Sequence, residues 1–325
     1  MLYDLAIIGG GPAGVAAGVY AARKKLKTVF ITKDFGGQSN VSTGIENWIG
    51  TVRLDGAELA KNLEAHLRAY AADTVDIRAG EWVKLVEKNG GGFRVTIDSG
   101  AYDARAVLVA TGSNRRKLPA KGADRLEHKG ITYCASCDGP VFSGKNVAVV
   151  GGGNAAFETV AQLLAYCPSV TIIHRGDKFR ADEIIIERVL ANPKTHVVKN
   201  ADIMEVKGEQ FVTGIVYKNK TTGAEKELAV EGVFVEIGSV PATDFVKDIV
   251  KRTEYGQIIT DPKTQRASPV NNWASPVNNW MNNGASASGV WAAGDCTDGL
   301  YHQNNIAAGD AVKALEDIYL YLHGK

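Results

Sequence analysis

The 325-residue sequence predicts an α/β protein of two three-layer domains, with the second domain inserted into the first. The first observation is an internal repeat: residues 5–14 (LAIIGGGPAG) match residues 147–156 (VAVVGGGNAA), and the match continues without a gap into the segments that follow. The second is the context of each copy, a β-branched strand before the turn and an amphipathic helix after it. The third is the placement of Pro119 and Pro241, where we expect the chain to cross between domains. The predicted domains are 1–116 with 246–325, and 117–245.

Composition and charge narrow the class of protein. With 45% hydrophobic residues, the chain can bury large cores. A net charge of +1 gives no indication of nucleic acid or an anionic membrane as a partner. No apolar run is long enough to span a bilayer, and the N-terminus leads directly into a strand, so we expect neither a membrane segment nor a signal peptide. Four cysteines in a chain of this length do not make a disulfide framework, and we expect a reducing, cytoplasmic location.

The glycines of the first repeat suit a dinucleotide. Gly9 permits a tight turn after the strand, Gly11 lets the backbone approach a pyrophosphate, and Gly14 allows the helix to pack closely on the strand. The N-terminus of the following helix offers N–H donors and a favourable dipole to phosphates. At the end of the second strand, where an acid often holds an adenosine ribose, Asp34 stands near the required position.

The second repeat carries the same pattern in Gly151, Gly153 and Ala156. Two fingerprints in register predict two Rossmann-like units, and the alternative is a pair of ordinary glycine-rich turns. The second strand of this copy leads into Arg175 and on to Arg180. Two arginines suit a 2′-phosphate, with a solvated basic loop as an equal alternative.

A CxxC motif, Cys134 to Cys137, precedes the second fingerprint and is followed by Asp138. Such a pair can close into a small disulfide ring, and a neighbouring acid can donate protons to the thiolates and accept protons from the thiols. The alternatives are half of a zinc site or two ordinary core cysteines. A zinc knuckle needs four ligands, and the remaining cysteines, Cys167 and Cys296, lie in unrelated contexts. We therefore expect redox chemistry and no bound metal.

Further elements follow from hydrophobic periodicity. Strands are expected at 107–112, 211–217, 232–237 and 289–295, a meander with an Asn89-Gly90 turn at 81–100, and a helix over 306–322.

Together these motifs resemble the low-molecular-weight bacterial thioredoxin reductases, and also the flavoprotein core of the alkyl hydroperoxide reductase system. The resemblance covers nearly the whole chain and implies a homodimer that binds FAD in the discontinuous domain and NAD(P)H in the inserted one. It rests on motifs in family order: Gly9–Gly14, Gly36-Gly37-Gln38, Glu46-Asn47, Ala110-Thr111-Gly112, Cys134–Gly139, Gly151–Ala156, Gly294-Asp295 and Tyr301-His302-Gln303.

The resemblance also implies a set of contact residues for each cofactor. FAD would be held by Gly9, Gly11, Pro12, Ala13, Gly14, Gly37, Gln38, Asn47, Thr111, Gly112, Gly294, Asp295, His302 and Gln303. The nicotinamide dinucleotide would be held by Gly151, Gly153, Asn154, Ala155, His174, Arg175 and Arg180.

The activity implied is a flavin-dependent reduction of thioredoxin or a thioredoxin-like protein. Hydride would pass from NADPH, or from NADH, to FAD and then to the disulfide. Cys137 would face the flavin, Cys134 would attack the partner's disulfide, and Asp138 would exchange the protons. The peroxide-system relative has an extra N-terminal disulfide domain that this sequence does not show, so the resemblance implies a separate protein partner.

Three departures from the family pattern leave alternatives open. Gly176 stands where many relatives have a second arginine, which weakens the expected preference for NADPH and allows NADH. His302 stands where relatives have arginine, either as a simple substitution or as a histidine that tunes the flavin. Residues 267–280 repeat Ala-Ser-Pro-Val-Asn-Asn-Trp in tandem, so Trp273 and Trp280 belong either to an exposed duplicated loop or to a docking surface.

The main alternative function is a reductase of another small redox protein or of a peroxiredoxin system, and for this alternative a donor other than NADPH stays open. An oxidase, a redox sensor or a simple FAD-holding scaffold agrees less well with an intact CxxC-Asp motif beside a complete nicotinamide fingerprint.

Overall fold

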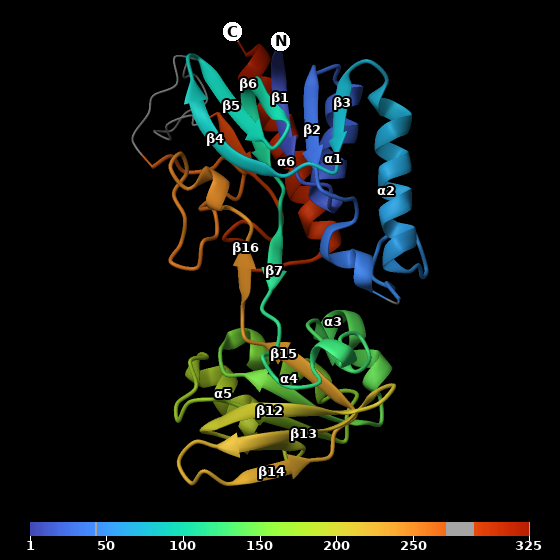
Figure 1. Cartoon of the computed structure of the whole chain (residues 1–325), viewed down its shortest axis with the longest axis vertical. Helices are drawn as coiled ribbons and strands as arrows, with labels where there is room; N and C mark the ends of the chain where they lie inside the picture. The colour runs from blue at the N-terminus through green and yellow to red at the C-terminus, as the bar shows by residue number, and fades with distance from the viewer. Residues whose placement is uncertain (43, 271–288, 325) are drawn as a thin grey trace. The chain divides into compact units, whose positions relative to one another are not determined.

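The computed structural model describes residues 1–42, 44–270 and 289–324. The chain forms two compact units, of which the first takes the blue and red ends of the colour range in Figure 1 and the second takes the green and yellow middle. Unit 1 comprises Met1–Asn114 and Val240–Lys325, and unit 2 comprises Arg115–Ser239. Unit 2 is thus inserted into the sequence of unit 1. The predicted fold class is confirmed, because each unit contains a mainly parallel sheet with helices packed on it.

A seven-stranded sheet forms the middle of unit 1. β4 (Val83–Asn89) and β5 (Gly92–Ile97) are the predicted meander, and Gly90 lies in the turn between them with a φ of 59°. β6 (Gly100–Val109) is long enough to pair antiparallel with β5 along its first half and parallel with β17 (Val290–Ala292) along its second half. In spatial order the strands are β3 (Val75–Ala79), β2 (Thr28–Thr32), β1 (Leu2–Ile8), β6 (Gly100–Val109), β5 (Gly92–Ile97) and β4 (Val83–Asn89), with β17 (Val290–Ala292) on β6.

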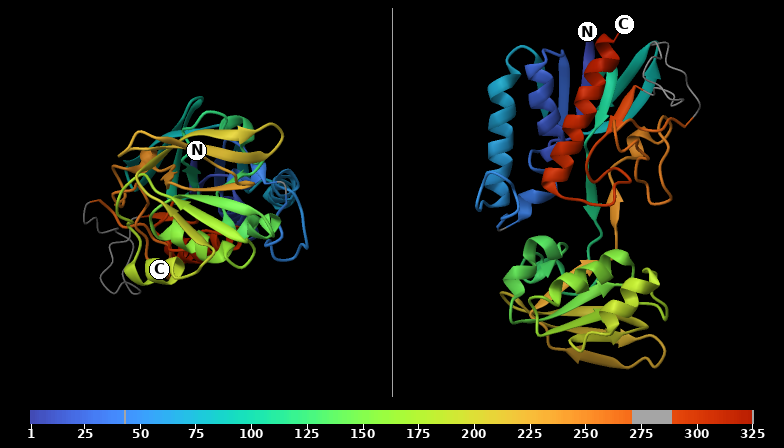
Figure 2. Two further views of the ribbon diagram at one scale, coloured as in Figure 1. Left: turned by 90° about the horizontal axis from the view of Figure 1, so that it is seen from below. Right: turned by 180° about the vertical axis from the view of Figure 1, so that it is seen from behind.

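Alternating side chains of β1 build the two cores of unit 1. Leu5 and Ile7 pack into the cluster shared with the helices, whereas Ala6 and Ile8 pack into the cluster on the opposite face. Figure 2 shows the helices together on one side of this sheet. They are α1 (Pro12–Arg23), α2 (Gly56–Ala71) and α6 (Asn304–His323).

Unit 2 has a parallel sheet between a helical layer and an antiparallel sheet. Phe157 and Phe234 belong to the core under the helices, and Ile203 and Val233 belong to the core under the antiparallel sheet. The parallel sheet has the order β11 (Thr195–Val198), β10 (Ser169–Ile173), β9 (Asn146–Gly151), β15 (Gly232–Glu236) and β8 (Ile131–Thr132). The antiparallel sheet is β12 (Ala201–Gly208), β13 (Val212–Asn219) and β14 (Glu225–Leu228), and the helices are α3 (Ala135–Asp138), α4 (Asn154–Leu163) and α5 (Glu183–Leu190).

Short elements complete the described chain. They are the paired strands β7 (Ser113–Arg115) and β16 (Ser239–Pro241) and the 3-10 turns η1 (Gly37–Val41), η2 (Asp124–Leu126), η3 (Gly139–Phe142) and η4 (Asp244–Val246). No helix in the described ranges is long and apolar enough to cross a bilayer. From Asn271 onward the predicted tandem insertion, which includes Trp273 and Trp280, lies outside the described residues.

The internal repeat is visible as two equivalent strand–turn–helix–strand units. In unit 1 it is β1, α1 and β2, and in unit 2 it is β9, α4 and β10, with parallel pairing in both. α1 begins at Pro12 and α4 begins at Asn154, which are matched positions of the two copies. The predicted duplication of a dinucleotide-type unit is therefore present in the fold.

Candidate active site

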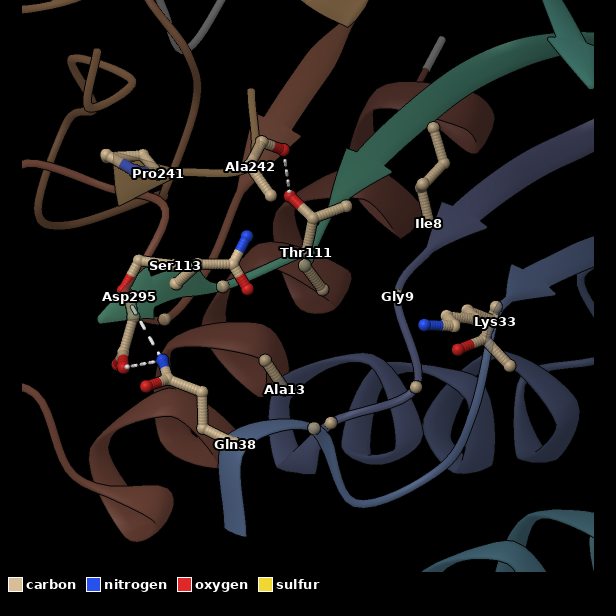
Figure 3. A pocket seen from close by; sticks show the side chains of 18 of the residues that line it. Ile8, Gly9, Ala13, Lys33, Gln38, Thr111, Ser113, Pro241, Ala242 and Asp295 are labelled. Atoms are coloured by element: carbon tan, nitrogen blue, oxygen red, sulfur yellow. Dashed lines mark hydrogen bonds between the residues drawn. The ribbon is translucent and has the colours of Figure 1, made fainter. Parts of the chain in front are cut away.

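A cavity of about 620 Å³ lies at the carboxyl ends of β1, β2 and β6 in unit 1 (Figure 3). Ligands of open α/β sheets bind in this kind of crevice, and the volume is within the range of cofactor sites. The predicted flavin residues that line it are Gly9, Gly11, Pro12, Ala13, Gly37, Gln38, Thr111, Gly112, Gly294 and Asp295. Gly14, Asn47, His302 and Gln303 are not in its wall.

The turn between β1 and α1 offers an open cradle for a phosphate. Gly11 is the N-cap of α1, no side chain caps the helix there, and a Cβ on Gly11 would meet no atom within 4 Å. The first N–H groups of a helix need acceptors, and a phosphate supplies them. Gly9 has a φ of 118°, and a Cβ there would lie 2.2 Å from the Ala110 carbonyl oxygen, so only glycine fits. The pyrophosphate of a dinucleotide therefore fits this cradle.

Gly14 serves the packing of that turn and does not face the cavity. A Cβ on Gly14 would lie 1.8 Å from the Gly9 carbonyl oxygen. This glycine lets α1 approach the turn closely, which is the packing role predicted for the last position of the fingerprint.

Polar side chains gather at the other side of the cavity. Gln38 Nε2 donates to Asp295 Oδ2 at 3.3 Å and to Ser113 Oγ at 3.4 Å, as Figure 3 shows. His302 Nδ1 lies 3.4 Å from Asp295 Oδ1. A carboxylate with neighbouring amide and hydroxyl groups can hold the hydroxyls of a bound ligand. Ser113 is a residue of this cluster that the sequence analysis missed.

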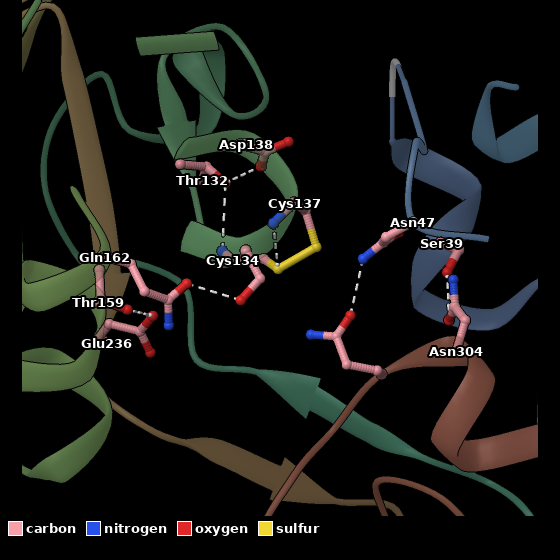
Figure 4. The surroundings of a disulfide bond; sticks show 12 residues. Ser39, Asn47, Thr132, Cys134, Cys137, Asp138, Thr159, Gln162, Glu236 and Asn304 are labelled. Atoms are coloured by element: carbon pink, nitrogen blue, oxygen red, sulfur yellow. Dashed lines mark hydrogen bonds between the residues drawn. A yellow bond between two sulfur atoms is a disulfide. The ribbon is translucent and has the colours of Figure 1, made fainter. Parts of the chain in front are cut away.

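A second polar cluster joins the loop before α2 to the start of α6. Asn47 Nδ2 donates to Gln303 Oε1 at 2.9 Å, and Asn305 Nδ2 donates to the Asn47 carbonyl oxygen at 2.6 Å. Ser39 Oγ donates to Asn304 Oδ1 at 3.0 Å (Figure 4). The predicted residues Asn47 and Gln303 thus contact each other, and their partners were not evident from sequence because they are distant in the chain.

The CxxC motif forms a disulfide in unit 2. Cys134 and Cys137 are bonded, with their Cα atoms 5.3 Å apart. Cys134 is the N-cap of the single-turn helix α3, and its Sγ accepts the Cys137 N–H at 3.1 Å. Ser136 between them donates to Gln162 Oε1 of α4 at 2.8 Å. The pair is therefore a disulfide held against α4, and the half-zinc alternative is not needed.

Asp138 is a half-buried carboxyl directly after the disulfide. Thr132 Oγ1 donates a hydrogen bond to Asp138 Oδ2. Burial raises the pKa of Asp138, and this outweighs the opposing effects of the Thr132 hydrogen bond and of the His128 charge. A carboxyl that keeps its proton to higher pH is suited to donate it to a departing thiolate. Thr132 was not predicted, although its place two residues before Cys134 was an indication in the sequence.

The second fingerprint has the same open N-terminus as the first. Gly153 is the N-cap of α4 without a capping side chain, and a Cβ on it would meet no atom within 4 Å. Asn154 and Ala155 are exposed beside it, and Asn154 Oδ1 accepts the Asp182 N–H at 2.8 Å. A Cβ on Gly151 would lie 2.5 Å from the Glu236 carbonyl oxygen, so this turn also requires glycine. The open backbone at this helix N-terminus therefore leaves room for a pyrophosphate in unit 2.

The basic loop after β10 lies beside this turn. Arg180 N donates to the Gly152 carbonyl oxygen at 2.7 Å, while the side chains of Arg175 and Arg180 are exposed. His174 is buried, and its Nε2 lies 2.9 Å from the Lys178 carbonyl oxygen. A Cβ on Gly152 would collide with the His174 ring. His174 therefore supports the loop from beneath, and the two arginines are free to meet an anionic ligand.

Glu236, which the sequence analysis did not select, ends β15 next to this fingerprint. Its Oε1 accepts a hydrogen bond of 2.8 Å from Thr159 Oγ1 on α4. Burial raises the pKa of Glu236 to about 7. Within the described residues, no group of three or more His, Cys, Asp or Glu side chains is arranged to hold a metal ion.

Comparison with known proteins agrees with this geometry. The sequence signature of the pyridine nucleotide-disulphide oxidoreductases matches residues 3–311. An NADH dehydrogenase of Bacillus subtilis (strain 168) is 36% identical over 321 residues, which is 98% of this chain and 58% of that protein. The F subunit of the alkyl hydroperoxide reductase of Staphylococcus aureus (strain Mu50 / ATCC 700699) is 36% identical over 322 residues, 98% of this chain and 59% of that protein. The chain thus spans less than two thirds of the length of these relatives.

Solved structures match along the whole chain. The thioredoxin reductase of Streptococcus pyogenes MGAS5005 has a TM-score of 0.86 and 32% identity, with 100% of this chain and 99% of that chain covered. The thioredoxin reductase from Giardia duodenalis has a TM-score of 0.85 and 29% identity, with 99% of each chain covered.

Proposed function

The chain belongs to the pyridine nucleotide-disulphide oxidoreductase family, and on this basis we propose that it is a flavin-dependent thioredoxin reductase. In each turnover, NAD(P)H, one proton and a protein disulfide would become NAD(P)⁺ and two thiols. The observation that carries the proposal is the Cys134–Cys137 disulfide beside the half-buried carboxyl of Asp138, in a unit that also has an open helix N-terminus at Gly153.

Unit 1 would hold FAD in its cavity. The α1 N-terminus at Gly11 would receive the pyrophosphate, and Gln38 and Asp295 would hold hydroxyls of the ribityl chain. Bound FAD would supply the two-electron chemistry between nicotinamide and disulfide. The chain's own part is to bind and orient this group in a cavity whose glycines leave the backbone accessible.

Reduction of the Cys134–Cys137 disulfide takes two electrons and leaves one thiolate and one thiol once a proton is supplied. The Cys137 N–H points at Cys134 Sγ and stabilises negative charge there, which favours Cys134 as the attacking thiolate. Its attack on the partner's disulfide forms a mixed disulfide and releases a thiolate of the partner. Cys137 then attacks Cys134, the chain's disulfide forms again, and the second partner thiolate leaves. Asp138 gives a proton to the departing thiolate.

The proposal extends to the electron donor and the partner. Arg175 and Arg180 favour an anionic adenosine end, so NADPH is the expected donor, with NADH accepted because Gly176 removes one cation. The disulfide partner is thioredoxin or a similar small protein. A homodimer and a cytoplasmic location complete the proposal.

Anaerobic stopped-flow reduction of the FAD-loaded protein with NADPH and with NADH tests it. We expect fast loss of flavin absorbance with at least one dinucleotide, followed by multiple turnovers when oxidised thioredoxin is added. Cys134→Ser keeps the first reaction and loses turnover with thioredoxin. Cys167→Ala, a buried thiol of the same unit outside the CxxC, keeps both. Failure of both dinucleotides to reduce a flavin that dithionite still reduces would rule out the nicotinamide-driven reductase.

A peroxiredoxin-type acceptor is the second candidate, favoured by the 36% identity with the alkyl hydroperoxide reductase protein of Staphylococcus aureus. In the same assay, thioredoxin is replaced by an oxidised peroxiredoxin, with and without catalytic thioredoxin. Turnover of the peroxiredoxin without thioredoxin would assign the peroxiredoxin as the direct electron acceptor.

A further inference from the structure

Glu236 occupies a defined place relative to the second fingerprint. It is the last residue of β15 and pairs with Gly151, the turn glycine of β9, in the parallel ladder. The backbone of Glu236 lies so close to that turn that Gly151 has no room for a side chain. The carboxyl therefore belongs to the edge of the sheet at which a dinucleotide binds.

The topology assigns the two halves of a dinucleotide to opposite sides of β9. β9 lies between β10 and β15, so the strand order reverses there. A dinucleotide crosses the sheet at such a switch point, with its pyrophosphate at the helix N-terminus. The β10 side carries Arg175, which suits the adenosine end, so the nicotinamide end falls on the β15 side with Glu236.

The surroundings hold the carboxyl in one position. Thr159 is buried, and its hydroxyl donates to Glu236 Oε1 at 2.8 Å. Figure 4 shows Thr159 and Glu236 side by side, with Gln162 one turn further along α4. The charged groups that act on Glu236 are Arg115, which favours its ionised form, and Glu158, which opposes it. The Thr159 hydroxyl occupies only one of the two carboxyl oxygens, so the other can accept a hydrogen bond from a ligand.

We propose that Glu236, held by Thr159, binds the carboxamide N–H of the nicotinamide ring and selects against dinucleotides that carry a carboxylate at that position. A carboxyl oxygen accepts a hydrogen bond from an amide N–H, whereas a ring carboxylate would bring a like charge to a half-buried anion. The inference rests on the proposed function, because it needs a nicotinamide dinucleotide in this cradle.

Binding of NAD⁺ and of nicotinic acid adenine dinucleotide to the oxidised, FAD-loaded protein tests the proposal by calorimetry. These two ligands differ only in carboxamide against carboxylate and both lack the 2′-phosphate. The variants are Glu236→Gln, which keeps the shape, and Thr159→Val, which removes the hydroxyl that holds Glu236. Glu231→Gln is the matched control, because Glu231 is exposed just before the opposite end of the same strand.

We expect the wild type and Glu231→Gln to bind NAD⁺ about tenfold or more tightly than the carboxylate analogue. In Glu236→Gln this ratio should fall to within about threefold, since an amide can donate to the ring carboxylate, and Thr159→Val should also lower it. An unchanged ratio in Glu236→Gln, with NAD⁺ still bound, overturns this inference alone. A wild type that binds no nicotinamide dinucleotide overturns the proposed function with it.

The pH dependence adds a second readout. Because burial raises the pKa of Glu236 to about 7, the carboxyl is largely neutral at pH 6 and ionised at pH 8.5. Discrimination against the carboxylate analogue should therefore increase with pH in the wild type and stay constant in Glu236→Gln. A wild-type ratio that falls as the pH rises contradicts the assignment.

Discussion

The Glu236→Gln substitution should stabilise unit 2 in a pH-dependent way. Burial raises the pKa of Glu236 from 4.5 to about 7, so the folded protein resists ionisation of this carboxyl. Below pH 4.5 the group is neutral in both the folded and the unfolded chain, and it costs nothing. Between pH 4.5 and about 7 the carboxyl ionises in the unfolded chain but stays protonated in the folded protein, so stability is lost across this interval, and above about pH 7 the loss is complete.

The size of the effect follows from the same two pKa values. At about 1.36 kcal/mol per pKa unit, a rise from 4.5 to about 7 corresponds to about 3 kcal/mol. Glu236 is only half-buried, so solvent screening reduces the expected gain of Glu236→Gln to about 2 kcal/mol above pH 7.5. At pH 5 the gain should be a few tenths of a kcal/mol, because the amide keeps an oxygen for Thr159.

Hydrogen exchange measured on peptides of unit 2 is the appropriate assay. All the tryptophans of the sequence belong to unit 1, so tryptophan fluorescence does not report on unit 2. Wild type and variant are compared at each pH, which cancels the intrinsic exchange rate, and peptides of β1 in unit 1 serve as the internal reference. A gain in protection that is equal at pH 5 and pH 8, or largest at pH 5, would refute the argument.

Four further predictions concern the flavin site, the acid, the hydrogen-bond partner of the acid and the donor. Gly9→Ala should lower the free energy of unfolding by at least about 1–3 kcal/mol and release FAD, because a Cβ at a φ of 118° meets the Ala110 carbonyl oxygen. Gel filtration measures how much FAD the variant retains. Asp138→Asn should slow thioredoxin turnover by about 10²–10⁴-fold while dinucleotide-driven flavin reduction persists; equal loss of both steps would argue against a proton-transfer role. Thr132→Val removes a hydrogen bond that lowers the pKa of Asp138, so the alkaline limb of the pH–rate profile should move to higher pH, and a move to lower pH would be inconsistent with this. Gly176→Arg should raise the preference for NADPH over NADH by about 10–100-fold in kcat/KM, because a charged hydrogen bond from the new arginine to the 2′-phosphate contributes about 1.5–3 kcal/mol. The control is Gly176→Ala, which adds only the Cβ.

Local features of this protein could be predicted from the sequence because they depend on residues close together in the chain. The glycine pattern requires tight turns at Gly9 and Gly151 whatever packs around them, and both have the required geometry. Cys134 and Cys137 are one helical turn apart and can reach each other, so the disulfide was predictable from their spacing. The repeat, the meander and the final helix followed from periodicity in the same way.

The tertiary structure alone decided which distant residues meet. Parallel strands bring their carboxyl ends to one edge, and this places Gln38 beside Asp295. The packing of α4 against β15 places Thr159 beside Glu236. The tertiary packing also buries the His174 ring beneath Gly152. The sequence had predicted that His174 contacts the dinucleotide. The pKa values of Asp138 and Glu236 are likewise tertiary properties. Burial by segments far apart in sequence raises them, and no local pattern encodes how much water a carboxyl loses on folding.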